Sequence, residues 1–189
     1  MPLRIARTFL AFAGAIAVTA TLASAQDADR AAPPHVRGAT IDAAQLLDEL
    51  VARSPTVRDL VDRLDRSDVL IYIRYQWFST TTLRGRIGFL AADQHRRLLA
   101  IEIGCRYTRT DQLVALGHEL QHAVEIADAP AVWDARSLAA FYTSIGDRTG
   151  YAATAETYET VAAAEMGRRV RSELATIAAP ADIVATDRN

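Results

Sequence analysis

Two stretches near the start of the chain carry apolar residues at helical spacing. The first, residues 40–53, has Thr40 at a position that favours an N-cap, and the second, residues 55–66, follows Ser54 and begins with Pro55. In the second, the arginines and aspartates fall on the opposite side of the helix from the apolar residues. The pattern therefore predicts two successive helices, each with one buried face.

The period changes from helical to alternating after the second helix. Residues 69–75 are rich in β-branched and aromatic side chains, and residues 97–103 alternate between apolar and other positions. Residues 83–90 also read as a strand but contain Gly85 and Gly88, where we expect a bulge. Three strands are therefore predicted, forming a small antiparallel or mixed sheet.

Helical spacing returns in the rest of the chain. Three further helices are expected, at residues 108–128, 134–145 and about 154–177. Thr108 or Thr110 caps the first of them, a loop at 146–150 precedes the last, and Thr154 or Thr157 begins the last. Helices and strands together predict an α+β domain, in which a three-stranded sheet packs against the helix at 108–128 and the other helices.

The first 25 residues have the features of a secretory signal peptide. Arg4 and Arg7 precede an apolar, alanine-rich segment at 8–22, and residues 23–25 form an Ala-x-Ala cleavage signal. We therefore expect cleavage after this signal and export to the periplasm or the extracellular medium. Because no later segment is long and apolar enough to span a bilayer, no stable membrane insertion is expected after cleavage.

The rest of the chain divides into three parts. Residues 26–38 are polar and contain a pair of prolines, which predicts a flexible leader. Residues 39–179 are expected to form a single domain, and residues 180–189 a C-terminal tail. A domain of this length can bury a sizeable core.

Composition excludes several kinds of chemistry. All 21 basic side chains are arginines, so a lysine Schiff base and a P-loop lysine are absent. Removing the two arginines of the signal peptide leaves 19 basic against 23 acidic residues, a net charge of −4, which argues against nucleic acid as a partner. Cys105 is the only cysteine, so no disulfide can form within the chain, and we interpret it as a small core residue after the third strand.

The candidate chemistry is concentrated in the helix predicted at 108–128, which contains His118-Glu119-Leu120-Gln121-His122. Positions i and i+4 lie on one face of a helix about one turn apart, so His118 and His122 can direct two imidazoles at one metal ion. Glu119 lies about 100° around the helix, beside the metal, where it can take a proton from a coordinated water. The spacing predicts a Zn²⁺ site with Glu119 as general base.

A catalytic zinc site has three protein ligands, so one more residue must join the two histidines. Glu159 is the first choice, because small residues near it in the last predicted helix would let that helix approach closely. Glu156 and Glu165 on the same helix are alternatives. Glu125 shares the histidines' face but lies about 10 Å from His118 along the helix axis, so we interpret it as a support for a ligand or an ordinary face carboxylate.

The motif followed by a glutamate on a later helix resembles the gluzincin branch of the zinc metallopeptidases. The order of elements over residues 69–175 is similar to the zincin fold, although Glu159 follows the motif at a greater distance than in the commonest gluzincins. The resemblance implies a peptide or protein substrate, hydrolysed by a zinc-activated water, that pairs with a strand edge at 99–103. The chain also resembles small secreted bacterial proteins that carry Gly-His-Glu-Leu-x-His-Ala.

Other interpretations of the motif remain open. Asp128 stands where metzincins have their third ligand, but Glu125 replaces the glycine at which their chain turns. A secreted zinc-binding module without activity would keep the histidines, and a structural helical domain would contain the motif by chance. Glu119 favours the peptidase over the silent module, because a structural zinc site needs no general base.

Overall fold

The computed structural model describes residues 33–80, 82–152 and 155–178. The chain divides into two compact units, of which the second begins at Pro34 and contains every helix and strand that the structure describes. The predicted signal peptide, the first part of the predicted leader and the predicted tail lie outside the described residues. No described helix is long and apolar enough to cross a membrane.

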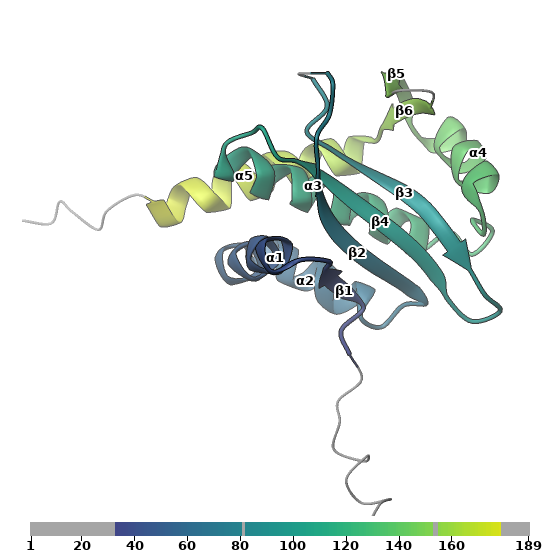
Figure 1. Ribbon diagram of the computed structural model, residues 1–189, viewed down its shortest axis with the longest axis horizontal. Helices are drawn as coiled ribbons and strands as arrows, with labels where there is room; N and C mark the ends of the chain where they lie inside the picture. The colour runs from purple at the N-terminus through teal and green to yellow at the C-terminus, as the bar shows by residue number, and fades with distance from the viewer. Residues whose placement is uncertain (1–32, 81, 153–154, 179–189) are drawn as a thin grey trace, which may run out of the picture. The chain divides into compact units, whose positions relative to one another are not determined.

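This second unit is a mixed α/β structure, with five helices and a four-stranded mixed sheet among the described residues (Figure 1). A separate two-stranded sheet precedes the last helix. The elements, in chain order, are β1 (Val36–Gly38), α1 (Ile41–Arg53), α2 (Pro55–Leu64), β2 (Val69–Gln76), β3 (Gly85–Ala92), β4 (Arg97–Gly104), α3 (Arg109–Ala127), α4 (Ala135–Ile145), β5 (Asp147–Ala152), β6 (Ala155–Glu159) and α5 (Val161–Ala178).

The larger sheet has the order β1-β2-β4-β3, with β1, β2 and β4 parallel and β3 antiparallel to β4. The mixed sheet agrees with the predicted α+β class, but the predicted number of three strands is wrong. The fourth strand, β1, lies in the segment predicted as a flexible leader. Val36 is 2% exposed and pairs with Ile71, so its burial ties this segment to the sheet in spite of the prolines before it.

The edge of the sheet differs from the prediction as well. Residues 99–103 belong to β4, which lies between β2 and β3, so the free edge next to β4 is that of β3. The register shifts between Phe89 and Ala91 and not at the two glycines where a bulge was expected. A glycine permits a bulge, but the cross-strand packing of neighbouring side chains decides where it falls.

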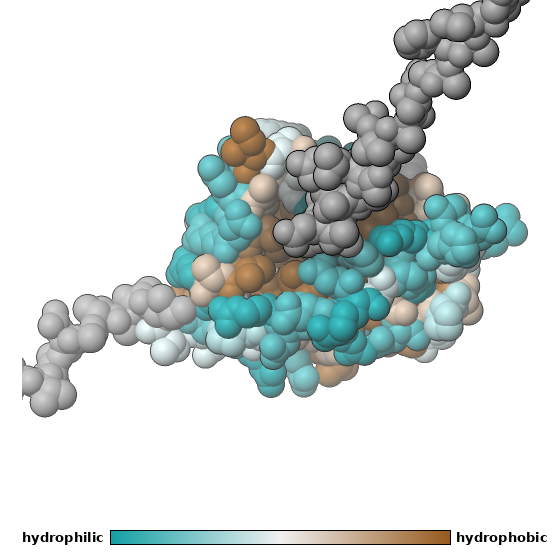
Figure 2. Space-filling view, turned by 90° about the horizontal axis from the view of Figure 1, so that it is seen from below, coloured by the Kyte–Doolittle hydropathy of each residue, from teal (hydrophilic) through white to brown (hydrophobic). Residues whose placement is uncertain are grey.

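The core lies between one face of this sheet and the helices. Ile71, Leu99 and Ile101 on the sheet and Leu116 and Leu120 on α3 are fully buried, and α3 packs on β3 and β4. Figure 1 shows α3 behind the sheet, and α5 packs in turn on α3. The outward face of α2 is charged as predicted, and the view from below in Figure 2 shows a largely hydrophilic surface.

The predicted helix starts are confirmed where a hydroxyl caps them. Thr40 accepts a hydrogen bond from the backbone of Ala43, Ser54 caps α2 in the same way, and Thr108 caps α3. The loop predicted at 146–150 is wrong, because β5 runs through it and pairs with β6. Two short antiparallel strands of this kind depend on each other, which a local pattern does not reveal.

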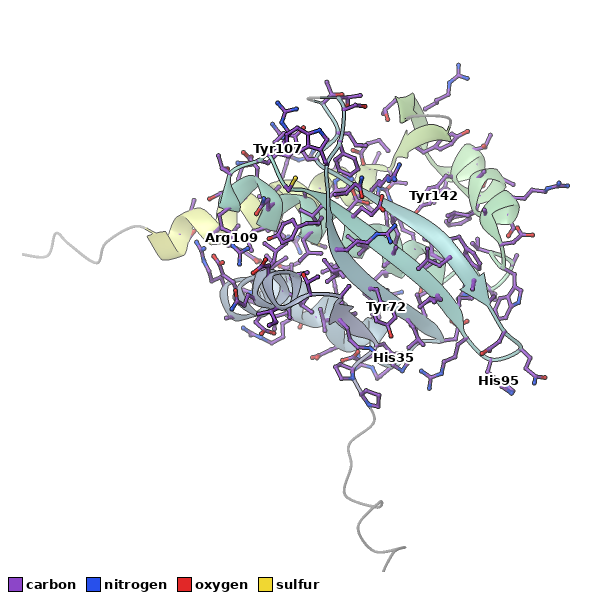
Figure 3. All side chains as sticks on the ribbon, in the orientation of Figure 1. His35, Tyr72, His95, Tyr107, Arg109 and Tyr142 are labelled. Carbon is purple, nitrogen blue, oxygen red and sulfur yellow. The ribbon has the colours of Figure 1, made fainter. Side chains whose placement is uncertain are left out.

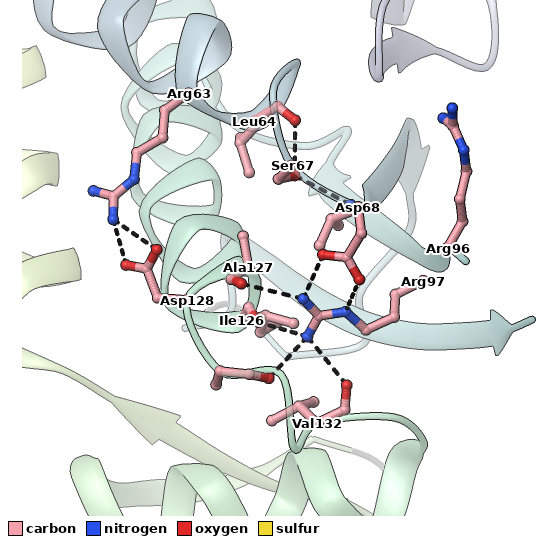
Figure 4. A network of polar contacts seen from close by, with 12 residues as sticks. Arg63, Leu64, Ser67, Asp68, Arg96, Arg97, Ile126, Ala127, Asp128 and Val132 are labelled. Atoms are coloured by element: carbon pink, nitrogen blue, oxygen red, sulfur yellow. Dashed lines mark hydrogen bonds and ion pairs between the residues drawn. The ribbon is translucent and has the colours of Figure 1, made fainter. Parts of the chain in front are cut away.

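Arg97, at the start of β4, is the largest fully buried side chain and binds the C-terminal end of α3 (Figure 4). Its Nε and Nη2 donate to the carboxylate of Asp68 at 2.7 and 2.6 Å. The guanidinium also donates to backbone carbonyl oxygens of Ile126, Ala127, Ala129 and Val132. One side chain thus satisfies carbonyls that a helix end leaves without partners and ties α3 to the sheet.

Candidate metal centre

Helix α3 presents His118 and His122 on one face, as the motif predicts. Their ring centroids are 4.9 Å apart with an angle of 76° between the rings. The cap at Thr108 begins the helix and Arg97 binds its far end, so both ends of the element that carries the motif are held. His122 is buried, whereas His118 is partly exposed.

Glu159 reaches both histidines from the end of β6. Its Oε1 lies 3.4 Å from Nε2 of His118 and 4.0 Å from Nε2 of His122. One atom from each of these three residues lies within 4.8 Å of the other two. Two ligand atoms bound to one tetrahedral zinc ion are roughly 3.3 Å apart, so small side-chain movements would place all three around a metal.

Glu159 was predicted in the first turns of a helix, and this context is wrong. It is the last residue of β6, and α5 begins two residues later at Val161. Thr160 caps that helix, because its Oγ1 accepts a hydrogen bond from the backbone of Ala163 at 3.1 Å. Glu159 therefore projects from a strand end that a capped helix holds in place.

The other candidate ligands lie elsewhere or act differently. Asp128 accepts hydrogen bonds from Arg63 on the surface, and Glu165 is exposed and lies 3.9 Å from Arg168. The side chain of Glu156 is outside the part of the chain that the structure describes. Glu125 is close to the site but contacts Nδ1 of His122, whereas Glu159 faces Nε2.

Glu125 connects His122 to the start of α5. Its Oε2 lies 2.8 Å from Nδ1 of His122, and its Oε1 accepts a hydrogen bond from Oγ1 of Thr160 at 2.7 Å. Burial acts to raise the pKa of Glu125, but the hydrogen bonds from His122 and Thr160 outweigh it and lower the pKa. The ionised carboxylate thus orients the ring and leaves Nε2 directed at Glu159.

Glu119 is buried beside the histidines, and its Oε2 has no hydrogen-bond partner among the described residues. Burial raises the pKa of Glu119 to about 7. A carboxyl group with such a pKa can both accept and release a proton near neutral pH. The strand β3 approaches it closely, because a Cβ on Gly85 would lie 2.9 Å from Oε1 of Glu119. Glycine at the start of β3 leaves room for this carboxyl group.

The two histidines differ in their electrostatic surroundings. Burial, and then the charge of His122, lower the pKa of His118 to about 4, so His118 is neutral and able to donate a lone pair at neutral pH. Burial acts to lower the pKa of His122 too, but the bond to Glu125 and the neighbouring carboxylates outweigh it and raise the pKa. The site therefore combines a neutral imidazole with carboxylates that attract a cation.

Tyr142, which is labelled in Figure 3, contacts His122 from α4. Its hydroxyl donates to the backbone carbonyl of His122 at 3.2 Å, and its ring lies 5.2 Å from the imidazole. Thr160 was not predicted to contact the motif helix. Gly85 was predicted only as a position where the strand could bulge. Their contacts join separate elements, and the sequence carries no local signal for them.

Cys105 was interpreted as a core residue, and this is wrong. It is exposed in the turn that leads from β4 to α3. The chain leaves the sheet after Gly104, so the run of buried positions in β4 ends before Cys105.

No protein-family model, no curated protein and no solved structure matches this chain. The residues of the centre and the fold around them are therefore the basis for any functional assignment.

Proposed function

We propose that this protein is an exported zinc-dependent metallopeptidase with a zincin-like fold. The observation that carries the proposal is the convergence of His118, His122 and Glu159 next to the buried carboxyl group of Glu119. Two imidazoles and one carboxylate are a donor set of catalytic zinc sites, which leave one position open. The antiparallel edge strand β3 beside Glu119 also supports a zincin-like arrangement, and export rests on the predicted signal peptide.

His118, His122 and Glu159 would hold the zinc ion, with Glu125 fixing the ring of His122. When bound, zinc supplies a Lewis acid that polarises the substrate carbonyl and acidifies the attacking water. Glu119 takes the proton from the water and later delivers it to the leaving amine, for which its pKa of about 7 is suited. The unpartnered Oε2 of Glu119 provides the acceptor atom.

The substrate in this proposal is a peptide or protein. Its backbone can pair with the free edge of β3, because a terminal strand has unpaired backbone groups that accept an added strand. The net negative charge of the chain argues against a nucleic acid substrate. The edge strand begins at Gly85, next to Glu119, so a peptide paired there passes the general base.

The test combines metal analysis with cleavage of a peptide library followed by mass spectrometry. We expect about one zinc per chain in the purified protein and in Glu119→Gln, because Glu119 is not a ligand. Peptide cleavage by Glu119→Gln should fall at least about 100-fold. Glu165→Gln is the matched control, since it changes an exposed glutamate of α5, and it should keep wild-type activity.

Two results would contradict the proposal in different ways. A wild-type protein that binds zinc but cleaves nothing would be a zinc-binding module without activity. A protein that binds no zinc, even after dialysis against the metal, would make the motif a feature of a purely structural domain.

A further inference from the structure

A small pocket opens at the end of the sheet where the parallel strands β2 and β4 finish. Its volume is about 120 Å³. The loop after β2 and the loop after β4 form its walls, and the backbone of Cys105 donates to the carbonyl of Gln76 to join them. The lining residues are Phe78, Thr80, Gly104, Cys105, Arg106 and Tyr107. Ligands of sheets with parallel strands commonly bind at such carboxyl ends.

Arginines stacked on aromatic rings surround this pocket. The guanidinium of Arg106 lies 4.6 Å from the ring centre of Trp77, and that of Arg84 lies 5.8 Å from the ring centre of Tyr107. Trp77 is 64% exposed, so Arg106 rests on an aromatic surface that faces solvent. Stacking leaves the edge of a guanidinium and its N–H groups free to bind an anion.

Arg106 carries the least compensated charge of this group. Arg74 and Arg86, further along the sheet, both bind Glu102. Arg84 has Asp111 as a nearby counter-charge. Hydrogen bonds from Arg171 and Thr108, and also the charge of Arg84, lower the pKa of Asp111. Among the described residues, no carboxylate forms an ion pair with Arg106.

The pocket lies close to the general base. The backbone N–H of Gly104 donates to the carbonyl of Arg84 at 2.8 Å, and the next residue, Gly85, approaches Glu119. Gly104 and Glu119 thus contact successive residues of the chain, Arg84 just before β3 and Gly85 at its start, and two residues of extended chain span roughly 7 Å. A peptide paired with β3 would bring a residue near its cleaved bond to the pocket. Figure 3 shows Tyr107 at this end of the sheet and His95 at the far hairpin.

We propose that this pocket binds a carboxylate of the peptide substrate through Arg106 and thereby selects the bond that is cleaved. The carboxylate is either an acidic side chain or the free C-terminus of the peptide. A volume of about 120 Å³ leaves room for the end of one side chain or for one chain terminus. The inference rests on the proposed peptidase function for its catalytic part, whereas binding of the carboxylate does not require cleavage.

The kinetic test uses peptides that differ only in one glutamate or glutamine beside the cleaved bond, each with a free or an amidated C-terminus. We expect the wild-type protein to prefer one carboxylate-bearing form by about tenfold in kcat/KM, which is typical of a charge-assisted contact. The form that is preferred identifies the source of the carboxylate. Arg106→Gln should lose this preference, so that its kcat/KM becomes the same for the carboxylate-bearing and the uncharged peptide.

Arg66→Gln is the matched control, because it removes an exposed arginine from the turn after α2 and should keep the preference. An equal kcat/KM for all peptides, or a preference that survives in Arg106→Gln, would overturn the proposal.

A binding test independent of cleavage uses Cys105, the only cysteine of the chain, which is exposed and lines the pocket. Iodoacetamide alkylates the thiol with loss of iodide and a proton. In Glu119→Gln, a carboxylate-bearing peptide should slow this alkylation severalfold, whereas its uncharged counterpart and any peptide added to Glu119→Gln/Arg106→Gln should not.

The two tests separate the two proposals. If the wild-type protein cleaves all the peptides equally well and no peptide slows the alkylation of Cys105, the peptidase function stands and the carboxylate pocket fails. If a carboxylate-bearing peptide slows the alkylation of Cys105 but the wild-type protein cleaves no peptide, the carboxylate pocket stands and the peptidase function fails.

Discussion

At the residue scale, one carboxylate determines how His122 is presented. Glu125 occupies Nδ1 of the imidazole and is itself held by Thr160, so the ring cannot rotate without breaking its hydrogen bond to an anchored carboxylate. A histidine ligand whose second nitrogen is bonded to a carboxylate has a fixed orientation and a stronger donor atom. Glu125 should therefore contribute to metal affinity without touching the metal.

Glu125→Ala tests this contribution. We expect the dissociation constant for zinc to rise about 10- to 100-fold, because the ring of His122 loses its orienting partner. Competition with a chromogenic chelator at constant pH measures the affinity. Glu165→Ala removes an exposed glutamate from α5 and should leave the affinity unchanged. An unaltered affinity in Glu125→Ala would mean that the bond to His122 has no part in binding.

At the element scale, α3 and α5 face each other with one glycine each, and the two glycines have different surroundings. A Cβ on Gly117 of α3 would lie 2.7 Å from Cγ2 of Val170, so the helices touch there. A Cβ on Gly167 of α5 would lie no closer than 3.7 Å to His118, an ordinary contact. The small residues expected on the later helix are thus matched by a glycine within the motif helix, directly before His118.

Alanine at these two positions should have opposite effects. Gly167→Ala should leave the free energy of unfolding unchanged or raise it by up to about 1 kcal/mol, because alanine favours a helix. Gly117→Ala gains the same propensity but must displace Val170, so we expect a net loss of roughly 1–2 kcal/mol. Urea unfolding of the two variants measures the difference. Equal stability would show that α3 and α5 can separate without cost.

At the scale of the whole domain, Arg97 and Asp68 join the sheet to the motif helix. Asp68 precedes β2, Arg97 begins β4, and the carbonyls that Arg97 binds lie at and just beyond the end of α3. The hydrogen bonds from Arg97 lower the pKa of Asp68 and outweigh its partial burial. Since Arg97 is 1% exposed, loss of its counter-charge leaves a buried cation with only backbone oxygens and the ring of Trp133 as partners.

Asp68→Asn should therefore be less stable than the wild type at pH 7, by roughly 1–3 kcal/mol. The pKa of Asp68 is lower in the folded than in the unfolded state, so its contribution is complete above the unfolded value of about 4. It is lost as the pH falls through the folded value, where the carboxylate takes up a proton. The stability difference between the two proteins should shrink accordingly, as urea unfolding at pH 7 and at lower pH would measure.

Asp62→Asn is the control, because Asp62 lies on the exposed face of α2. Its stability should follow that of the wild type at both pH values. If the difference in the free energy of unfolding between wild type and Asp68→Asn is the same at pH 7 and at the lower pH, the charge of Asp68 has no role in stability.

The sequence by itself determined the elements whose signals are local. Helical spacing with a capping hydroxyl placed α1, α2 and α3, and β-branched residues placed β2. The spacing of His118 and His122 was sufficient to put both imidazoles on one face, because helix geometry depends only on the backbone. It also indicated Glu119 as their neighbour and Glu159 as the first candidate for a partner.

Only the tertiary structure decided which distant groups meet. It brought Glu159 to the histidines from a strand end, paired Val36 with Ile71, and buried Arg97 against the end of α3. Each of these contacts joins residues far apart in the chain. Their free energy depends on burial and pairing that exist only once the elements have packed, so no periodicity in the sequence records them.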